Sequence, residues 1–179
     1  MKKAYFWILV LSLALNGCAT RVSTSFDRQA DFSRYKTFCW LQGCEFTFTG
    51  PGYMNDSTVV SNLKSAIIKE MEEKGFIYDA ENHDLLLDFH VTVENRQTNV
   101  YRFEEDRFLQ LDPVDQSDVY YFLEGTLIMD IADRETGQMI WRSSASRYLE
   151  LNPEMSEKNL RRGIGIVLKK FPPKDKSGM

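Results

Sequence analysis

The sequence predicts a single α+β domain of two layers, with two helices packed on one face of a mixed or mostly antiparallel sheet. The chain has 179 residues, of which 43% are hydrophobic and 27% charged, as is typical of one globular core. Two segments repeat apolar residues at helical spacing, and several others alternate them as strands do. Because the order is strand, helix, strands, helix, two helices on one sheet face is the simplest arrangement.

The first predicted strand covers residues 35–40, where side chains alternate between two faces and β-favouring residues dominate. Residues 20–25 are small and polar, which suits either a short tether or an edge strand. Residues 41–55 contain three glycines and a proline, so they predict a loop.

A first helix is predicted between Asp56, which caps its start, and Gly75, which stops it. Its apolar residues recur at helical spacing: Val59, Val60, Leu63, Ala66, Ile67 and Met71. Residues 84–94 then alternate as a strand. Its inward side chains are Leu85, Leu87, Phe89, Val91 and Val93.

Residues 95–118 are the least regular part and predict an acidic loop, although residues 100–103 would also suit a strand. Residues 119–132 and 138–149 predict a hairpin, because their connection is too short for parallel pairing. A second helix is predicted to begin at Asn152-Pro153 and to end before Pro172-Pro173. Its apolar stripe is Leu160, Ile164, Val167, Leu168 and Phe171.

Residues 1–17 predict a signal peptide, because Lys2 and Lys3 precede a twelve-residue apolar run. Twelve helical residues reach about 18 Å, against roughly 30 Å of hydrocarbon, so this run is too short to span a bilayer. The string Leu15-Asn16-Gly17-Cys18 resembles the lipobox of bacterial lipoproteins, which implies cleavage before Cys18 and acyl chains such as palmitate on its sulfur. A secretory signal cut at another bond, with Cys18 unmodified, is the alternative.

The predicted organisation is a signal peptide over 1–17, a lipidated cysteine and tether over 18–25, one α+β domain over 26–173, and a polar tail over 174–179. In the lipoproteins that the leader resembles, an aspartate after the acylated cysteine favours the inner membrane. Ala19 at this position implies the periplasmic face of the outer membrane.

Charge and composition exclude several partners and cofactors. Without residues 1–17 the chain has 20 basic and 26 acidic side chains, a net charge of −6, which makes nucleic acid a poor partner. No run of lysine or arginine follows Cys18, so we expect the acyl chains to hold the membrane. No cofactor motif is present.

Cys39 and Cys44 predict a disulfide, because the periplasm oxidises thiols. A free thiol pair, or a catalytic or metal-binding role, stays open as an alternative. His83 and His90 are the two histidines, and His90 shares a strand face with Asp88. We expect this pair to be a solvated polar face and not a metal site, because the sequence fixes no third ligand.

The sequence favours a protein that is not an enzyme. It has no nucleophile elbow, P-loop or zinc-protease motif. Asp112, Asp115 and Asp118 lack the glycine turn and terminal glutamate of a calcium loop, so a solvated loop is expected. Glu124 and Asp130 lie on one side of a predicted strand, where two acids could act as a glycosidase pair.

Five short motifs together resemble a bacterial envelope lipoprotein family defined by a domain of unknown function. They are Asp31-Phe32-Ser33-Arg34-Tyr35-Lys36-Thr37-Phe38 with Trp40, Lys74-Gly75-Phe76, Glu124-Gly125-Thr126-Leu127-Ile128, Thr136-Gly137 before Ile140-Trp141-Arg142, and Phe171-Pro172-Pro173. The match covers most of residues 22–173, apart from the cysteine pair and the acidic stretch over 95–118. The resemblance implies an α+β domain in the cell envelope and brings no catalytic residues.

These observations predict a non-enzymatic module that binds or scaffolds another envelope component, a protein or a glycan. An exposed aromatic patch would mark its contact surface. The candidates are Phe46, Phe48 and Tyr53, or Tyr101 and Phe103. The alternatives are an envelope glycan hydrolase that uses Glu124 and Asp130, and a lipoprotein that binds a small ligand between helices and sheet.

Overall fold

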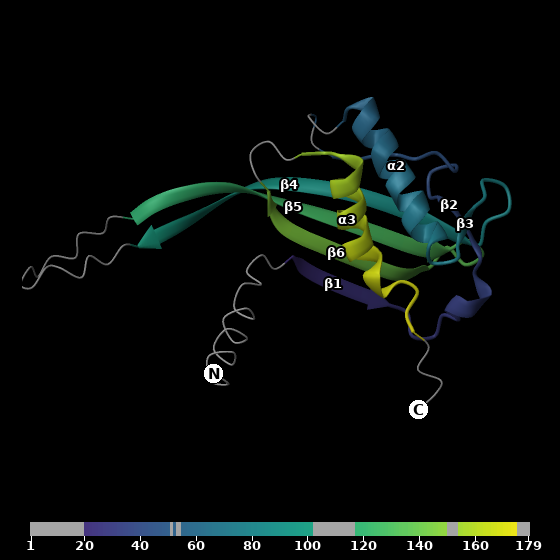
Figure 1. Ribbon diagram of the computed structural model, residues 1–179. Helices are drawn as coiled ribbons and strands as arrows, with labels where there is room; N and C mark the ends of the chain where they lie inside the picture. The colour runs from purple at the N-terminus through teal and green to yellow at the C-terminus, as the bar shows by residue number, and fades with distance from the viewer. Residues whose placement is uncertain (1–19, 51, 53–54, 102–116, 150–153, 175–179) are drawn as a thin grey trace, which may run out of the picture.

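The computed structural model describes residues 20–50, 52, 55–101, 117–149 and 154–174. Six strands form one mixed sheet in the order β1-β6-β5-β4-β2-β3, and the helices α2 and α3 pack on one of its faces (Figure 1). The strands are β1 (Arg21–Phe26), β2 (Thr37–Trp40), β3 (Ile77–Tyr78), β4 (Leu85–Tyr101), β5 (Ser117–Asp133) and β6 (Met139–Leu149). The helices are α2 (Ser57–Glu72) and α3 (Glu157–Val167), with 3-10 turns η1 (Phe32–Arg34) and η3 (Leu168–Lys170). The predicted α+β class is therefore confirmed.

The sheet combines two kinds of pairing. Strands β1, β6, β5 and β4 pair with one another antiparallel, whereas β2 is parallel to both β3 and β4. The parallel pairs follow from α2, which carries the chain from β2 back to the start of β3 and β4. The sequence allowed a tether or an edge strand over residues 20–25, and the edge strand β1 forms there, over Arg21–Phe26.

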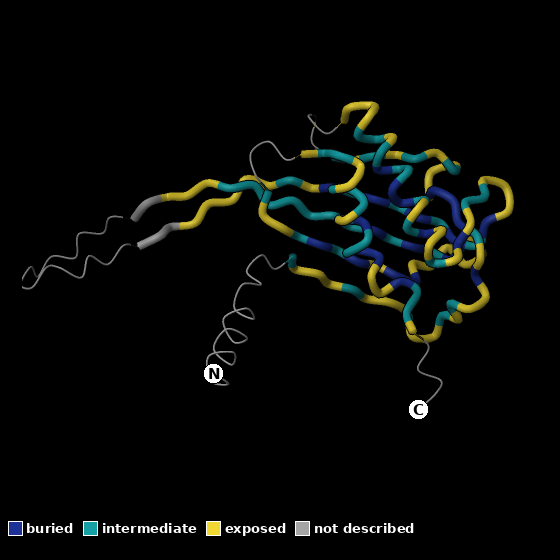
Figure 2. The backbone as a smooth tube through the Cα atoms, viewed as in Figure 1, coloured by how far each residue is buried: buried dark blue, intermediate teal, exposed yellow. Residues whose placement is uncertain are grey.

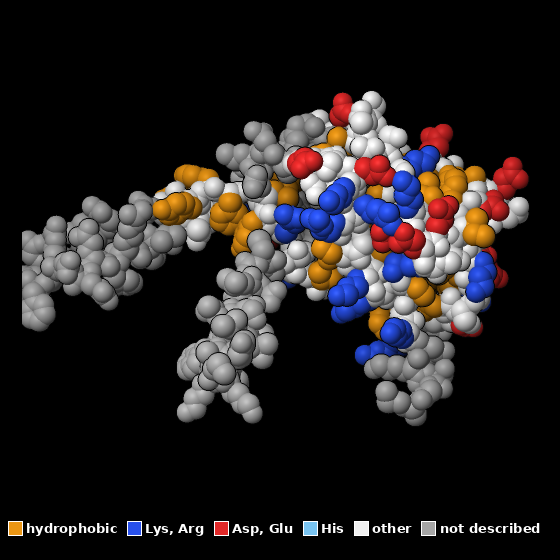
Figure 3. All heavy atoms as spheres, viewed as in Figure 1, with side chains coloured by type: hydrophobic (Ala, Val, Ile, Leu, Met, Phe, Trp, Pro, Cys, Tyr) orange, Lys and Arg blue, Asp and Glu red, His pale blue; other side chains and the backbone are white. Residues whose placement is uncertain are grey.

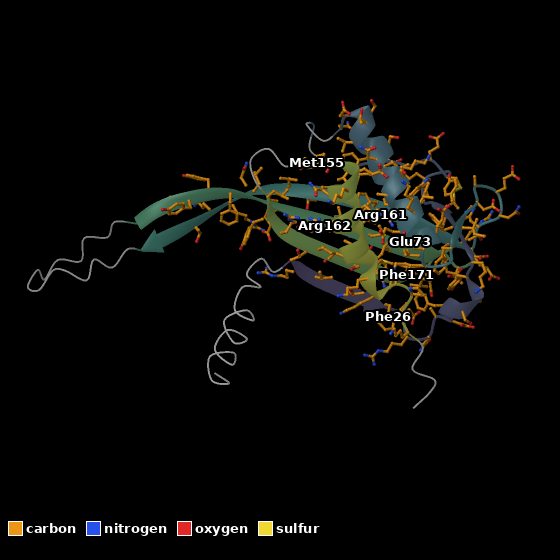
Figure 4. The ribbon with its side chains drawn as sticks, viewed as in Figure 1. Phe26, Glu73, Met155, Arg161, Arg162 and Phe171 are labelled. Atoms are coloured by element: carbon orange, nitrogen blue, oxygen red, sulfur yellow. A yellow bond between two sulfur atoms is a disulfide. The ribbon has the colours of Figure 1, made fainter. Side chains whose placement is uncertain are left out.

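The core lies between the sheet and the two helices (Figure 2). The register of β4, β5 and β6 places alternate residues on the helix side, so the apolar set predicted for residues 84–94 faces the helices. Phe171 ends the C-terminal segment against Trp141 and Phe76, with ring centroids 5.2 Å and 5.1 Å away (Figure 4). The fully buried side chains of this core include Leu63, Ile67, Met71, Leu85, Leu87, Phe89, Met129, Ile131, Trp141, Ile164 and Leu168.

Ion pairs fasten the two helices to each other above the core. Arg161 of α3 reaches Glu70 of α2 at 3.0 Å and also contacts Glu73, the C-cap of that helix (Figure 4). Lys69 of α2 pairs with Glu157 in the first turn of α3 at 2.7 Å. These pairs set the position of α3 along α2, while the apolar stripes provide most of the stabilisation.

Two predicted boundaries were wrong. Helix α3 begins at Glu157 after the N-cap Ser156, later than the predicted start at Asn152-Pro153, which lies outside the described residues. A glutamate in the first turn complements the positive end of the helix dipole, and this signal competes with the Asn-Pro signal. Residues 95–101 and 117–118 belong to β4 and β5, and not to an acidic loop. Their side chains show no apolar alternation, so pairing between the two strands decides the structure.

Two glycines allow opposite predictions for alanine substitution. Gly75 ends α2 with φ at +88°, a conformation that costs residues with a Cβ about 1–2 kcal/mol. Gly163 lies inside α3, and a Cβ built there meets no atom within 4 Å. Gly75→Ala should lower the free energy of unfolding by about 1–2 kcal/mol, and Gly163→Ala should raise it by up to about 1 kcal/mol. Urea unfolding of both variants measures this, and a change of the same sign in both would contradict the assigned conformations.

Candidate functional site

The predicted lipidation site, Cys18, lies outside the described residues. The sequence places Ala19 and Thr20 between it and Arg21, the first residue of β1. Among the helices that the structure describes, none is long and apolar enough to cross a bilayer. The folded part therefore presents no helical membrane span in its described residues.

The predicted disulfide joins Cys39, at the buried centre of β2, to Cys44, whose Cα lies 5.3 Å away. The intervening chain reverses direction through Gly43 and Cys44, which have φ angles of +59° and +62°. Backbone pairing between Gln42 and Glu45, an isolated β-bridge, closes this turn. A positive φ is unusual for a residue with a side chain, and the Tyr78 hydroxyl supports this conformation by donating to the Cys44 carbonyl at 3.1 Å.

His83 lies beside the disulfide. Its ring Nδ1 is 4.0 Å from Cys44 Sγ, and 8% of the residue is exposed. Burial and the nearby charge of Arg134 lower the pKa of His83, against the opposing effects of Asp79 and Asp84. No sequence pattern indicated this contact, because it depends on the turn that carries Cys44 back toward the segment before β4.

A buried carboxylate, Asp133, organises the same end of the sheet. Asp133 is 4% exposed and accepts hydrogen bonds from the Tyr35 hydroxyl at 2.6 Å and the Arg34 guanidinium at 2.9 Å. The backbone N–H groups of Glu135 and Thr136 donate to its other oxygen at 2.7 and 3.0 Å. Asp133 thus closes the β5–β6 turn and fastens the segment before β2 to it.

Asp84 fastens the same segment to the start of β4. Its carboxylate accepts from the backbone N–H groups of Lys36 and Thr37 at 2.7 and 3.0 Å, and the Thr37 hydroxyl accepts from the Asp84 N–H at 3.0 Å. Most polar side chains of the motif over 31–38 therefore have structural partners.

An open hollow of about 310 Å³ lies over these residues. It is lined by Arg34, Tyr35, His83, Asp84, Asp133, Arg134 and Glu135. This lining is charged and polar, and the hollow lies at one end of the sheet. It is therefore not the apolar cavity between helices and sheet that the small-ligand alternative requires.

Opposing effects set the protonation of Asp133 and Tyr35, which are both buried. Burial by itself raises the pKa of Asp133, but the hydrogen bonds from Tyr35, Thr136 and Glu135 and the Arg34 charge outweigh it, so the pKa lies below its usual value. Burial and the bond to Asp133 raise the pKa of Tyr35 to about 12. At neutral pH the pair is therefore a phenol that donates to a carboxylate.

Glu124 and Asp130, the two acids of the hydrolase alternative, lie far apart, and each is bound to an arginine side chain. Glu124 accepts from Arg96 at 2.9 Å, and Asp130 holds Arg142 through two bonds of 2.6 and 2.5 Å. Six residues of one strand separate them, which corresponds to about 20 Å. Glycosidase carboxylates lie roughly 5–9.5 Å apart, so these two side chains do not form such a pair.

His90 contacts Asp88 at 2.8 Å on the sheet face that carries no helix. Among the described residues, this pair belongs to no group of three metal-ligating side chains. The acidic residues considered for calcium, Asp112 and Asp115, lie outside the described residues. Asp118 is part of β5.

Of the aromatic residues predicted to mark a contact surface, the two whose side chains the structure describes, Phe46 and Phe48, are partly buried. Phe46 packs on Trp40 with ring centroids 4.9 Å apart, and Phe48 is half-buried against the core. Tyr53 and Phe103 lie outside the described residues, as does the side chain of Tyr101. The exposed large apolar residues of the described chain include a group at one end of the sheet: Val119, Tyr120 and Tyr121 on β5 and Tyr148 on β6.

These residues lie on or beside an arm that is formed by the paired ends of β4 and β5. Strand β6 ends at Leu149, opposite Leu123 of β5, whereas β4 and β5 stay paired to Tyr101 and Ser117. We call residues 95–98 and 119–122 the arm. It extends beyond the body of the sheet (Figure 1) and is exposed along its length (Figure 2). Phe122, at its base, packs edge-on against Tyr148 at 4.7 Å.

The buried carboxylate yields a prediction about acid stability. Because the folded pKa of Asp133 is lowered, its stabilisation is present at neutral pH. It is lost as the pH falls below 3.8 through the folded pKa. Asp133→Asn should lower the free energy of unfolding by about 1–3 kcal/mol at pH 7, and it should flatten the decline of stability at acid pH. Chemical unfolding at several pH values measures both effects.

Glu135→Gln is the matched control, because the Glu135 side chain is 82% exposed. It should keep the acid slope of the unsubstituted protein. Equal slopes for the unsubstituted protein and Asp133→Asn would contradict the role assigned to Asp133.

Two solved structures show how far this chain resembles known proteins. The chain is similar to a PDZ domain protein from Parabacteroides distasonis, at 16% identity and a TM-score of 0.53, over 93% of this chain and 39% of that one. It thus spans about two fifths of that protein, and the likeness shows a shared fold alone. It is also similar to the PelC dodecamer from Paraburkholderia phytofirmans, at 12% identity and a TM-score of 0.47, over 84% of this chain and 96% of that one.

No curated protein matches the chain. The family model DUF4136, described as a domain of unknown function, matches residues 22–173. This range includes every described strand except the first residue of β1, and both described helices. The chain therefore belongs to the DUF4136 family.

Proposed function

We propose that this protein is a lipid-anchored, non-enzymatic module that binds or scaffolds another component of the bacterial envelope, on the periplasmic face of the outer membrane. The observation that carries the binding role is the arm, which extends exposed aromatic and apolar side chains past the body of the sheet. The anchor is supported by the leader sequence and by Cys18.

The arm has the surface chemistry of a contact site. Tyr121 is 75% exposed, Tyr120 47% and Val119 44%, and Figure 3 displays hydrophobic side chains along it. Neighbouring residues of a strand point to opposite faces, so Tyr120 and Tyr121 place a phenol ring on each face. Tyrosine is enriched in protein interfaces because it buries a large area and loses little side-chain entropy.

The arm also offers backbone groups. In the described part of the chain, neither edge of the arm pairs with a further strand. Unpaired strand edges bind extended segments of partners through main-chain hydrogen bonds. A partner could therefore combine aromatic contacts with strand pairing.

Three carboxylates, those of Glu124, Asp130 and Asp133, are better suited to a structural role than to catalysis. Glu124 and Asp130 are each paired with an arginine. Asp133 accepts hydrogen bonds from four groups, two of them backbone amides. A general acid or base needs a carboxylate that can reach a substrate, and these three carboxylates stabilise the fold instead.

The anchor and the arm belong to the same end of the sheet. Arg21 pairs with Ser146 of β6, three residues before the end of that strand, and the arm continues from this end (Figure 1). Three residues of chain span at most about 11 Å, so acylation of Cys18 would hold β1 close to the bilayer. A partner of the arm would then be met near the membrane surface.

The anchor predicts the mass of the native protein. Mass spectrometry should find a chain that begins at Cys18 and carries acyl groups, because lipoprotein processing cuts before the modified cysteine. Cys18→Ala should keep the leader and lose the acyl mass, while Cys44→Ala, the control, should keep the acylated start. Native protein with an unmodified Cys18 would refute the anchor.

The arm predicts a position-specific contact. A photo-crosslinking residue at position 121 should capture one reproducible protein or glycan in intact cells. The same residue at position 77 should not. Ile77 is also apolar and 63% exposed, but it lies in the edge strand β3, away from the arm. Equal yields from both positions, or no adduct at position 121, would contradict a contact through the arm.

A further inference from the structure

We propose that Cys39, Cys44 and His83 form a binding site for a d10 metal ion such as Zn²⁺ when the disulfide is reduced. Within the described residues, they make up a group of three metal-ligating side chains whose ligand atoms lie within 4.8 Å of one another. The site is independent of the lipid anchor and of the arm, which lies at the other end of the sheet.

The separations of the ligand atoms suit such an ion. Zinc bonds of about 2.3 Å to sulfur and 2.0–2.1 Å to nitrogen place two ligands of a tetrahedral ion roughly 3.5–3.8 Å apart. Cys44 Sγ and His83 Nδ1 are already 4.0 Å apart. The main movement required is separation of the two sulfur atoms after the covalent bond breaks, which side-chain rotation can supply.

The backbone around the site is fixed by interactions that do not involve sulfur. Asp79 accepts from the N–H groups of Glu81 and Asn82, both at 2.9 Å, and Arg134 donates to the carbonyl groups of Glu81 and His83 at 3.3 Å. Cys39 is held in β2 by pairing with β4. The imidazole and one thiol therefore keep their positions when the disulfide opens, and the turn with Cys44 completes the set.

The chemistry balances in two steps. A dithiol reductant first gives two electrons and two protons to the Cys39–Cys44 bond, which yields two thiols and the oxidised reductant. The metal ion then displaces the two thiol protons, binds both thiolates and the imidazole, and leaves one position for water. Disulfide and metal exclude each other, because bonded sulfur atoms cannot serve as two thiolate ligands.

Two thiolates and one imidazole favour a soft or borderline ion. Such ligands select Zn²⁺ or Cu⁺ over Mg²⁺ or Ca²⁺, which prefer oxygen. The ligand atoms are partly shielded, since Cys39 is fully buried and His83 is 8% exposed. His83 also lines the polar hollow, so water and ions can approach the imidazole from this side.

The test is metal titration of the purified mature chain before and after reduction with a phosphine. The reduced protein should bind one equivalent of Zn²⁺, and the oxidised protein none. His83→Gln should weaken binding at least tenfold, whereas His90→Gln, the matched control on the open sheet face, should not change it. Equal binding by oxidised and reduced protein, or equal effects of the two histidine variants, would overturn the site.

A spectroscopic measurement on the unsubstituted chain covers the case in which His83→Gln fails to fold. Co²⁺ in place of Zn²⁺ should give thiolate-to-cobalt charge-transfer absorption and the visible bands of a tetrahedral ion after reduction. The intensities should saturate at one equivalent. Bands typical of six-coordinate cobalt, or no charge-transfer absorption, would equally overturn the proposal.

Discussion

The structure depends on the antiparallel pairing of β4 with β5, which runs from Leu85 opposite Asp133 to Tyr101 opposite Ser117. These two strands, of 17 residues each, are longer than the other strands of the sheet. Its first half is covered by helices and supplies the centre of the core. Its second half continues past β6 and forms the arm, so one continuous ladder of hydrogen bonds connects the most buried part of the protein with its most exposed surface.

The two ends of this ladder have different chemistry. At the arm, aromatic side chains and strand edges face outward. At the other end, hydrogen bonds of Asp133 and Asp84 connect the segment before β2, the start of β4 and the β5–β6 turn in one polar network. The disulfide and His83 lie at this polar end. Reduction or metal binding there would act on a part of the molecule remote from the proposed partner surface.

The polar network also explains why the segment over residues 31–38 says little about activity. Tyr35 donates to Asp133, Thr37 exchanges bonds with Asp84, and Asp31 caps the short turn η1. These residues maintain the fold at a junction of several chain segments, and each is occupied by a partner inside the protein. This segment therefore maintains the structure, and function has to be sought on surfaces that it does not form.

The sequence alone was sufficient for the α+β class, for α2 between Asp56 and Gly75 and for the inward face of residues 85–91, because caps, glycines and periodicity are local signals. It favoured the Cys39–Cys44 disulfide only through the expected oxidising compartment and left a free thiol pair open. The tertiary structure decided the rest. Residues 95–101 become a strand through their partners on β5, the two acids of the hydrolase alternative pair with arginines of neighbouring strands, and His83 meets Cys44 through a reversed turn. Each of these depends on contacts between segments far apart in the chain, and such contacts leave no periodic pattern in either segment.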